Sequence, residues 1–198
     1  MRSARADRGA EPAPSVLEVV SKTLLLMRHG KSSRKAGCPD LERPLTGRGR
    51  RDSAATGALV SEVFGVPDVW LSSTAARALQ TATLAAEACG HHGIVQAVTA
   101  LYSTAAGDLV EALLDVDDGA GSAIVIAHNP GLEELWAQLT GRAEHLPTAA
   151  VAAIELEIGG WTSLQSGARG RAIGLWCPRR LRAPGDGQAP LPAGGRRP

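Results

Sequence analysis

Short apolar runs and longer apolar stripes alternate along the chain. The short runs have the length of buried strands, and the stripes repeat every three or four positions, as one face of a helix does. Strands are expected at residues 23–27, 68–71, 94–98, 123–127, 151–158 and 171–176. Helices are expected at residues 46–64, 73–89, 108–114 and 129–139. This alternation predicts an α/β protein, a three-layer α/β/α sandwich around a mostly parallel central sheet.

Polar residues mark the points where three of these helices begin. Thr46 has the side chain of an N-cap residue, and Ser73 or Thr74 takes that place before the second helix. Asn129 is expected to cap the last helix, with Pro130 at its first helical position. Helix N-termini present free backbone N–H groups, so the turns before them favour anions.

The two ends of the chain differ in composition from the part between them. Residues 1–22 are rich in Ala, Arg and Pro, and residues 178–198 consist mainly of Pro, Gly and Arg. Neither end has apolar periodicity, so we expect a disordered N-terminal extension and a disordered C-terminal tail. Residues 23–177 are expected to form a single domain, with an edge strand near its end.

Overall composition excludes several classes of protein. The 198 residues are 44% hydrophobic and carry a formal net charge of +1, which gives no general attraction to nucleic acid or to a membrane surface. No run approaches the ~20 apolar residues of a membrane span. Ala, Pro and acidic residues follow the first arginines in place of an apolar h-region, so we expect no secretory signal. The three cysteines are widely spaced and form no metal-binding motif, so we expect free thiols in a reducing cytoplasm: Cys38, Cys89 and Cys177.

Three segments share the order of strand, polar turn and helix. Their turns carry Arg28-His29-Gly30, the stretch from Ser72 to Arg77, and His128-Asn129-Pro130. If the strands are parallel neighbours, the three turns meet at one edge of the sheet, where α/β proteins bind ligands. Two guanidinium groups and two imidazoles would then surround one point and form a pocket for a dianionic phosphate. Because residues 23–177 are mildly acidic as a whole, such an anion site has to be built locally.

Chemistry suggests a division of labour in this pocket. His29, directly at a strand end, is the candidate nucleophile toward phosphorus. His128 and the two arginines, Arg28 and Arg77, would stabilise the phosphoryl oxygens as their charge redistributes. The arginines supply the positive charge, so no metal or other cofactor is required. Taken singly, Arg77 could instead be a solvated helix residue and His128 a loop histidine bonded to a backbone carbonyl.

The pattern resembles the histidine phosphatase superfamily, also called phosphoglycerate mutase-like, over roughly residues 23–157. The matching elements are Arg28-His29-Gly30, Arg43-Pro44-Leu45-Thr46 with Gly49, Ser72-Ser73 to Arg77 with Gln80-Thr81-Ala82, and His128-Asn129-Pro130. The resemblance implies that His29 is the phosphohistidine nucleophile and that Arg28, Arg77 and His128 complete the phosphate pocket. The short chain, with Leu101-Tyr102 and Pro147-Thr148, is similar to the SixA-type phosphohistidine phosphatases of this superfamily.

The sequence departs from many mutases and phosphomonoesterases of the superfamily. These carry a glutamate proton donor near the position of Leu101-Tyr102, whereas here no carboxylate follows until Asp108. There is also no large cap insertion. Both departures argue against a sugar-phosphate mutase and favour a leaving group that needs no dedicated acid, such as the imidazole of phosphohistidine.

Three functions remain open from the sequence. The first is a metal-independent phosphatase that forms a phosphohistidine intermediate and acts on phosphohistidine in a protein. The second is a small-molecule phosphomonoesterase in which Asp40, Glu42, Asp108 or Glu111 is the acid. The third is a non-catalytic module that binds a phosphorylated partner, against which the pair of histidines argues, because binding alone needs only the arginines. The oligomeric state is left open.

Overall fold

The structure is a computed structural model, and it describes residues 21–34, 37–103 and 105–178. All six expected strands are present, with ends that differ by at most two residues from the expected ones. Their bounds are β1 Ser21–Arg28, β2 Val69–Ser73, β3 Val95–Val98, β4 Ser122–Ala127, β5 Val151–Glu157 and β6 Gly170–Trp176. The expected tails fall almost entirely outside the described residues. Strand β1, however, begins two residues before the expected start of the domain.

The strands form one sheet in the order β3-β2-β4-β1-β5-β6. Strand β4 runs parallel to both β1 and β2, and β2 runs parallel to β3. Strand β5 pairs antiparallel with β1, and β6 pairs antiparallel with β5. The mostly parallel sheet expected from the sequence is therefore confirmed, with an antiparallel hairpin-like edge added by the last two strands.

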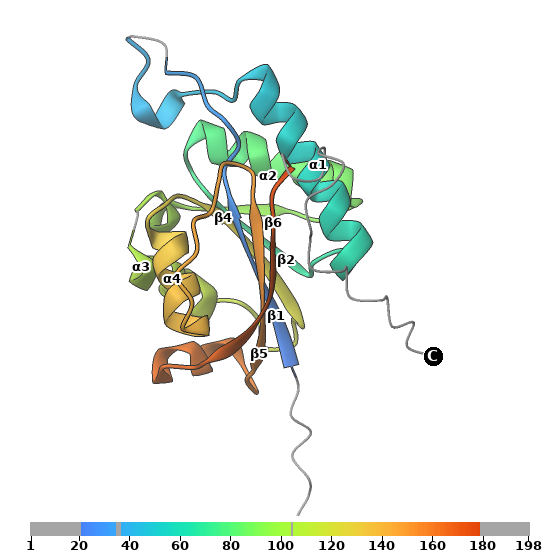
Figure 1. Cartoon of the computed structure of the whole chain (residues 1–198), viewed down its shortest axis with the longest axis vertical. Helices are drawn as coiled ribbons and strands as arrows, with labels where there is room; N and C mark the ends of the chain where they lie inside the picture. The colour runs from blue at the N-terminus through green and yellow to red at the C-terminus, as the bar shows by residue number, and fades with distance from the viewer. Residues whose placement is uncertain (1–20, 35–36, 104, 179–198) are drawn as a thin grey trace, which may run out of the picture.

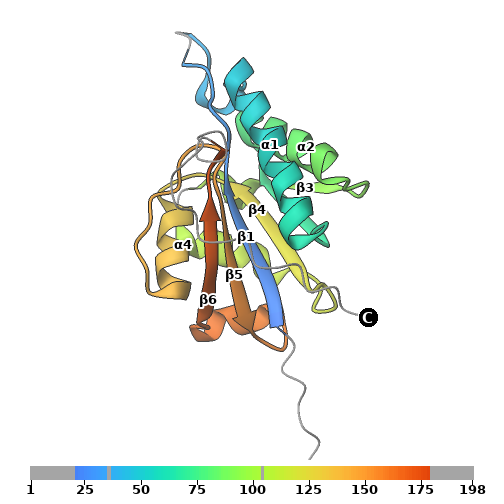
Figure 2. The ribbon, with the colours of Figure 1, turned by 45° about the vertical axis from the view of Figure 1, so that its right-hand side comes forward.

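Four helices cover the two faces of this sheet and complete the three layers. They are α1 Gly47–Phe64, α2 Ala76–Cys89, α3 Ala106–Leu114 and α4 Gly131–Thr140. Helices α1 and α2 lie together on one face, and α3 and α4 lie on the other, as Figures 1 and 2 show from two directions. The predicted three-layer α/β/α sandwich is confirmed. None of the helices in the described part is long and apolar enough to cross a membrane.

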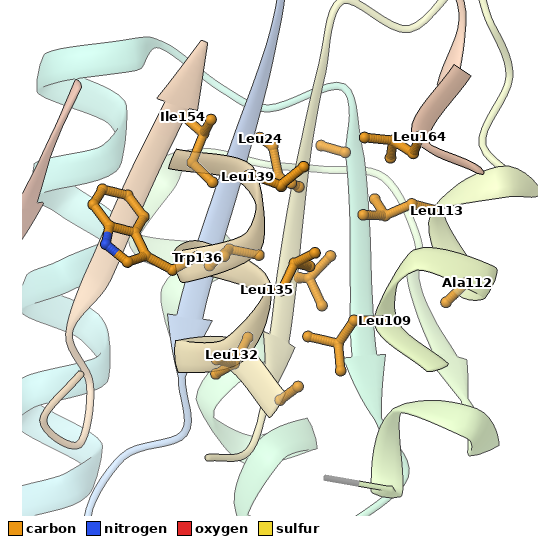
Figure 3. Packing of buried hydrophobic residues seen from close by; sticks show 14 of the residues in the cluster. Leu24, Leu109, Ala112, Leu113, Leu132, Leu135, Trp136, Leu139, Ile154 and Leu164 are labelled. Atoms are coloured by element: carbon orange, nitrogen blue, oxygen red, sulfur yellow. The ribbon is translucent and has the colours of Figure 1, made fainter. Parts of the chain in front are cut away.

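Helix α4 illustrates how the apolar stripe builds one core. Leu132, Leu135 and Leu139 repeat at helical spacing and are almost fully buried. Figure 3 shows these side chains on the side of α4 that faces the sheet, in one cluster with Leu24 and Ile154 of the sheet and Leu109 and Leu113 of α3. Burial of each such side chain stabilises the fold by roughly 1.5–3 kcal/mol.

The opposite core, between the sheet and helices α1 and α2, is built largely from small residues. Ala78, Ala82 and Ala85 of α2 have no exposed surface. Gly57 of α1 lies so close to α2 that a Cβ atom there would be 2.1 Å from the carbonyl oxygen of Ala85. The scarcity of aromatic residues in the chain thus corresponds to a close, small-residue contact between these two helices.

Two of the expected helix caps are wrong. Thr46 caps α1, since its hydroxyl accepts a hydrogen bond from the Gly49 N–H. Helix α2, however, begins after Ala75 without a side-chain cap, and α4 begins after Pro130, whose peptide bond with Asn129 is cis. Ser73 or Thr74 was expected to cap α2 and Asn129 to cap α4, and none of them does. The side chains of Ser73 and Asn129 bond instead to residues around the site described below.

Candidate active site

The carboxyl ends of three parallel strands meet at one edge of the sheet. Arg28 at the end of β1 lies beside Ala127 at the end of β4, and Ser72 of β2 lies beside Ile126. The helix after β1 covers one face and the helix after β4 covers the other (Figure 1). A crevice opens where neighbouring strands send their connections to opposite faces, so β1 and β4 define the binding edge.

A cavity of about 540 Å³ lies at this edge, and all four residues singled out from the sequence line it. Its lining residues are Arg28, His29, Asp40, Arg43, Arg77, Tyr102, Ser103, His128 and Asn129. The ring centroids of His29 and His128 are 5.0 Å apart. The structure therefore brings together the two histidines and two arginines, as the shared order of strand, polar turn and helix predicts.

The hydrogen bond of His29 determines which of its nitrogens carries the proton. Nδ1 lies 2.8 Å from the carbonyl oxygen of Gly30. A carbonyl oxygen can only accept, so Nδ1 donates and Nε2 is left with its lone pair. A neutral imidazole with an unprotonated Nε2 is the form required of a nucleophile.

His128 is held in the opposite tautomer by two neighbours. Its Nδ1 accepts from the guanidinium Nη2 of Arg77 at 3.4 Å, so the ring proton is on Nε2. That nitrogen donates to the hydroxyl of Ser73 at 2.9 Å, which also accepts from the Ala75 N–H. Ser73 thus orients the imidazole, which explains why its side chain does not cap α2.

Both imidazoles are neutral in the phosphate-free protein. Burial and the nearby arginines, acting against the bond to Gly30, lower the pKa of His29 to about 4. Burial, followed by the proximity of His29 and Arg77, lowers the pKa of His128 to about 3. A dianion bound between them would favour protonation of one ring, so the site is poised to couple anion binding to proton uptake.

The two predicted arginines are anchored at fixed points by backbone carbonyls. Arg28 donates from Nη1 to the Leu146 oxygen at 2.8 Å. Arg77, in the first turn of α2, donates from Nη1 to the Asp40 oxygen at 2.7 Å. These contacts orient one edge of each guanidinium and fix the charges around the cavity before any ligand binds.

Glu133 of α4 supports the Arg28 contact from behind. Its carboxylate accepts from the Leu146 N–H at 2.9 Å and from the side chain of Asn129, and it pairs with His145 at 2.8 Å. Asn129 also donates to the Leu146 oxygen at 3.0 Å. The carbonyl that holds Arg28 is therefore itself held from two sides, which accounts for the side chain of Asn129 being unavailable as a cap.

Asp40 is the main residue whose place the sequence did not predict. It lies in a short 3-10 helix, η1 (Asp40–Glu42), and was only one of four candidate acids. Its carboxylate accepts from the Tyr102 hydroxyl at 2.9 Å and pairs with Arg43 at 2.8 Å and Arg77 at 3.1 Å. The hydrogen bond from Tyr102, together with the two arginines, lowers the pKa of Asp40. Of the four candidates, all described, Asp40 alone lines the cavity.

Other matched motifs hold the loops of the site in place. The Gly30 N–H donates to the Thr81 hydroxyl at 2.9 Å, and the Leu45 N–H donates to the Gln80 side chain at 2.9 Å. A Cβ atom at Gly30 would lie 2.8 Å from the Gly49 oxygen, so only glycine fits this close approach. Gln80 and Thr81 therefore connect the His29 turn and the following loop to helix α2.

The described side chains around the cavity do not form a metal site. Among the described residues, no three or more His, Cys, Asp or Glu side chains are grouped so that they could hold a metal ion. The cysteines are free thiols, and Cys89 and Cys177 are buried. The charge that faces the cavity comes instead from Arg28, Arg43 and Arg77.

Comparison with known proteins agrees with this geometry. The sequence profile of the histidine phosphatase superfamily (branch 1) matches residues 24–111, which include the first three of the motifs named above. An uncharacterized protein of Mycobacterium tuberculosis is 29% identical over 167 residues, which are 77% of this chain and all of that protein.

Solved structures show the same fold. A SixA protein from Nakamurella multipartitia, named a putative phosphohistidine phosphatase, aligns with a TM-score of 0.72 and 23% identity, over 80% of this chain and 96% of that one. A SixA structure complexed with tungstate aligns with a TM-score of 0.70 and 24% identity, over 81% and 99% of the two chains. The chain is thus similar to the histidine phosphatase superfamily over residues 24–111, and it shares the phosphoglycerate mutase-like fold of these structures.

Proposed function

We propose that the protein is a metal-independent phosphatase that works through a phosphohistidine on His29. Similarity to the histidine phosphatase superfamily over residues 24–111 supports a phosphatase. The observation that carries the proposal is the hydrogen bond from Nδ1 of His29 to Gly30, because it leaves Nε2 as a nucleophile beside Arg28 and Arg77. Phosphate binding alone would need the arginines but not an imidazole in this tautomer.

The reaction would run in two displacements. Nε2 of His29 bonds to phosphorus while the bond from phosphorus to the leaving group breaks, and the arginines stabilise the phosphoryl oxygens. A water molecule then attacks phosphorus, the bond to Nε2 breaks, and inorganic phosphate is released. Nδ1 of His128 accepts from Arg77 before a ligand binds. When the dianion binds, this nitrogen would take up a proton and donate a hydrogen bond to a phosphoryl oxygen in place of that contact.

Phosphohistidine in a protein is the substrate that we favour. An alkoxide leaving group needs a general acid, which contributes ~10²–10⁴-fold to the rate. The pKa of Asp40 is lowered, so this carboxyl is ionised at neutral pH and is a poor proton donor. The imidazole released from phosphohistidine can already be protonated at neutral pH, so it leaves without such an acid.

A small-molecule phosphomonoesterase is the second candidate, and one observation favours it. Asp40 lines the cavity and is the only carboxylate among the described lining residues. If binding of a phosphate dianion displaced Asp40 from Arg77 and raised its pKa, the carboxyl could protonate an ester oxygen.

The test is a panel of substrates with matched variants. The protein should hydrolyse phosphohistidine peptides and nitrophenyl phosphate, and should act far more slowly on phosphoserine peptides and alkyl phosphates. His29→Ala should lose nearly all turnover while remaining folded, and wild type should yield an acid-labile phosphoenzyme at His29. Equal rates with alkyl and nitrophenyl phosphates would favour the phosphomonoesterase, whereas phosphate binding without turnover would indicate a binding module.

A further inference from the structure

A second, smaller cavity lies beside the first and has a basic lining. It has a volume of about 180 Å³ and shares Arg28, His29 and Arg43 with the first cavity. Its remaining lining residues, which we call the basic annex, are Lys31, Ser32, Arg34 and Thr148. Lys31 and Arg34 in the annex add two positive charges to those of Arg28 and Arg43 in the shared wall. No carboxylate is among the described residues that line this second cavity. Because the chain is nearly neutral overall, this concentration of positive charge is local.

The backbone of the annex is held rigidly. The Ser33 N–H donates to the Pro44 oxygen at 2.8 Å, and the Thr46 N–H donates to the Lys31 oxygen at 2.8 Å. Ser32 lies between them and pairs with Leu45 in an antiparallel bridge. These bonds tie the segment that carries Lys31 to the start of helix α1.

Close packing against α1 adds to this restraint. A Cβ atom at Gly49 would lie 2.2 Å from the carbonyl oxygen of Lys31, so the two backbones are in direct contact. Ser32 is buried, whereas the side chains of Lys31 and Arg34 are exposed. The annex is therefore a hydrogen-bonded backbone frame with two exposed cations at its rim, which suits capture of an anion from solvent.

The wall shared by the two cavities contains donors without an acceptor. The Nε atoms of Arg28 and Arg43 are buried and have no hydrogen-bond partner among the described residues. Nη1 of Arg28 donates to the Leu146 oxygen, and the terminal nitrogens of Arg43 contact Asp40 and the Ser33 oxygen. Buried guanidinium donors of this kind favour a bound anion, because an unpaired buried donor is costly.

We infer that the basic annex binds a second anionic group of the substrate, an acidic side chain next to the phosphohistidine of a target protein. The inference rests on the proposed function, since it takes the phosphoryl group to lie in the first cavity. The shared wall of Arg28 and Arg43 would then contact both anions, which places the second anion immediately beside the reacting phosphate. A small phosphocarboxylate has the same pair of anions and is distinguished by the test.

The experiment compares phosphohistidine peptides that differ only in Glu or Gln beside the phosphohistidine. Wild type should show a kcat/KM about three- to tenfold higher for the Glu peptide, and high salt should reduce this preference. The double variant K31Q/R34Q should bring the ratio close to one, while its turnover of nitrophenyl phosphate stays at the wild-type value. R50Q/R51Q, which removes two exposed arginines of α1 outside both cavities, should keep the preference.

Several outcomes would overturn the inference. One is an absence of preference in wild type, and another is a preference that survives in K31Q/R34Q or disappears equally in R50Q/R51Q. A preference for alkyl phosphates that carry a carboxylate, without one for acidic peptides, would keep the anion chemistry but reject the peptide. If wild type hydrolyses none of these substrates, the proposed function fails, and calorimetric binding of the two peptides to H29A still decides whether the annex recognises the acidic group.

Discussion

At the scale of single residues, the candidate site depends on which nitrogen holds each proton. His29 keeps its proton on Nδ1 through Gly30, and His128 keeps its proton on Nε2 through Ser73. The two rings therefore present lone pairs from opposite nitrogens in one buried space. Two neutral imidazoles next to guanidinium groups resist protonation, and this property can be measured without any substrate.

These two histidines should make the folded protein less stable as the pH decreases. Their pKa values in the folded protein, about 4 for His29 and about 3 for His128, lie below the ordinary 6.5 of an unfolded chain. The unfolded state therefore binds protons first, so the stabilisation is complete above pH 6.5 and is lost as pH falls toward 4, by up to about 1.4 kcal/mol per pH unit per histidine. Urea unfolding of wild type and of H29N/H128N between pH 7 and 4.5 should show a smaller loss in the variant, and parallel curves would contradict the assignment.

Asp40 forms an ion pair with Arg77, one of the arginines that we expect to bind phosphate. Its carboxylate lies 3.1 Å from Arg77, whose side chain is 7% exposed. Asp40→Asn should free this guanidinium and strengthen inhibition by vanadate by roughly three- to tenfold, since a partly exposed ion pair contributes about 1 kcal/mol. Glu42→Gln, in the same 3-10 helix but exposed and outside the cavity, is the matched control. Weaker inhibition in Asp40→Asn would mean that the carboxylate instead positions Arg77.

At the scale of elements, the sequence predicted the strands and their turns better than the helix caps. Arg28 and His128 follow buried apolar strands, and parallel pairing alone brings such strand ends together. Ser73 and Asn129 have good capping side chains, but neither caps, because a histidine and a carbonyl of the site compete for them. Asp40, Arg43 and Tyr102 could not be placed, since they lie in irregular segments whose path depends on contacts between distant parts of the chain.

The contact between helices α1 and α2 should be sensitive to a single methyl group. A Cβ atom at Gly57 would lie 2.1 Å from the backbone of Ala85, whereas Gly47 in the same helix has no neighbour closer than 3.7 Å. Gly57→Ala should therefore lower the free energy of unfolding by about 1–3 kcal/mol. Gly47→Ala should be neutral or slightly stabilising, because alanine favours helix. Denaturant unfolding checks both, and equal stability of the two variants would mean that the helices can separate at little cost.

At the scale of the whole molecule, the cavity and the buried Lys22 lie at opposite ends of β1. The carboxyl ends of β1 and β4 carry the cavity. Near the other end of β1, Lys22 is almost fully buried, and its ammonium donates to the carbonyl oxygens of Asp118 and Ala120 at 2.7 and 2.9 Å. Composition placed Lys22 in the N-terminal extension because a lysine in a polar segment gives no sign of burial. The structure makes it part of the domain.

The boundary of the folded unit follows from this lysine. A chain shortened to residues 21–178 should keep the melting temperature and the nitrophenyl phosphatase activity of the full chain, because residues 1–20 and 179–198 have no apolar periodicity to pack. A loss of stability on this shortening would show that an end packs on the domain. Lys22→Met in the full chain should lower the free energy of unfolding by about 1–3 kcal/mol, since it removes the hydrogen bond from the lysine ammonium to the backbone oxygen of Asp118. Activity per folded molecule should be unchanged in Lys22→Met, because the substituted residue lies at the end of β1 away from the cavity; a selective loss of turnover would show that the two ends of the sheet are coupled.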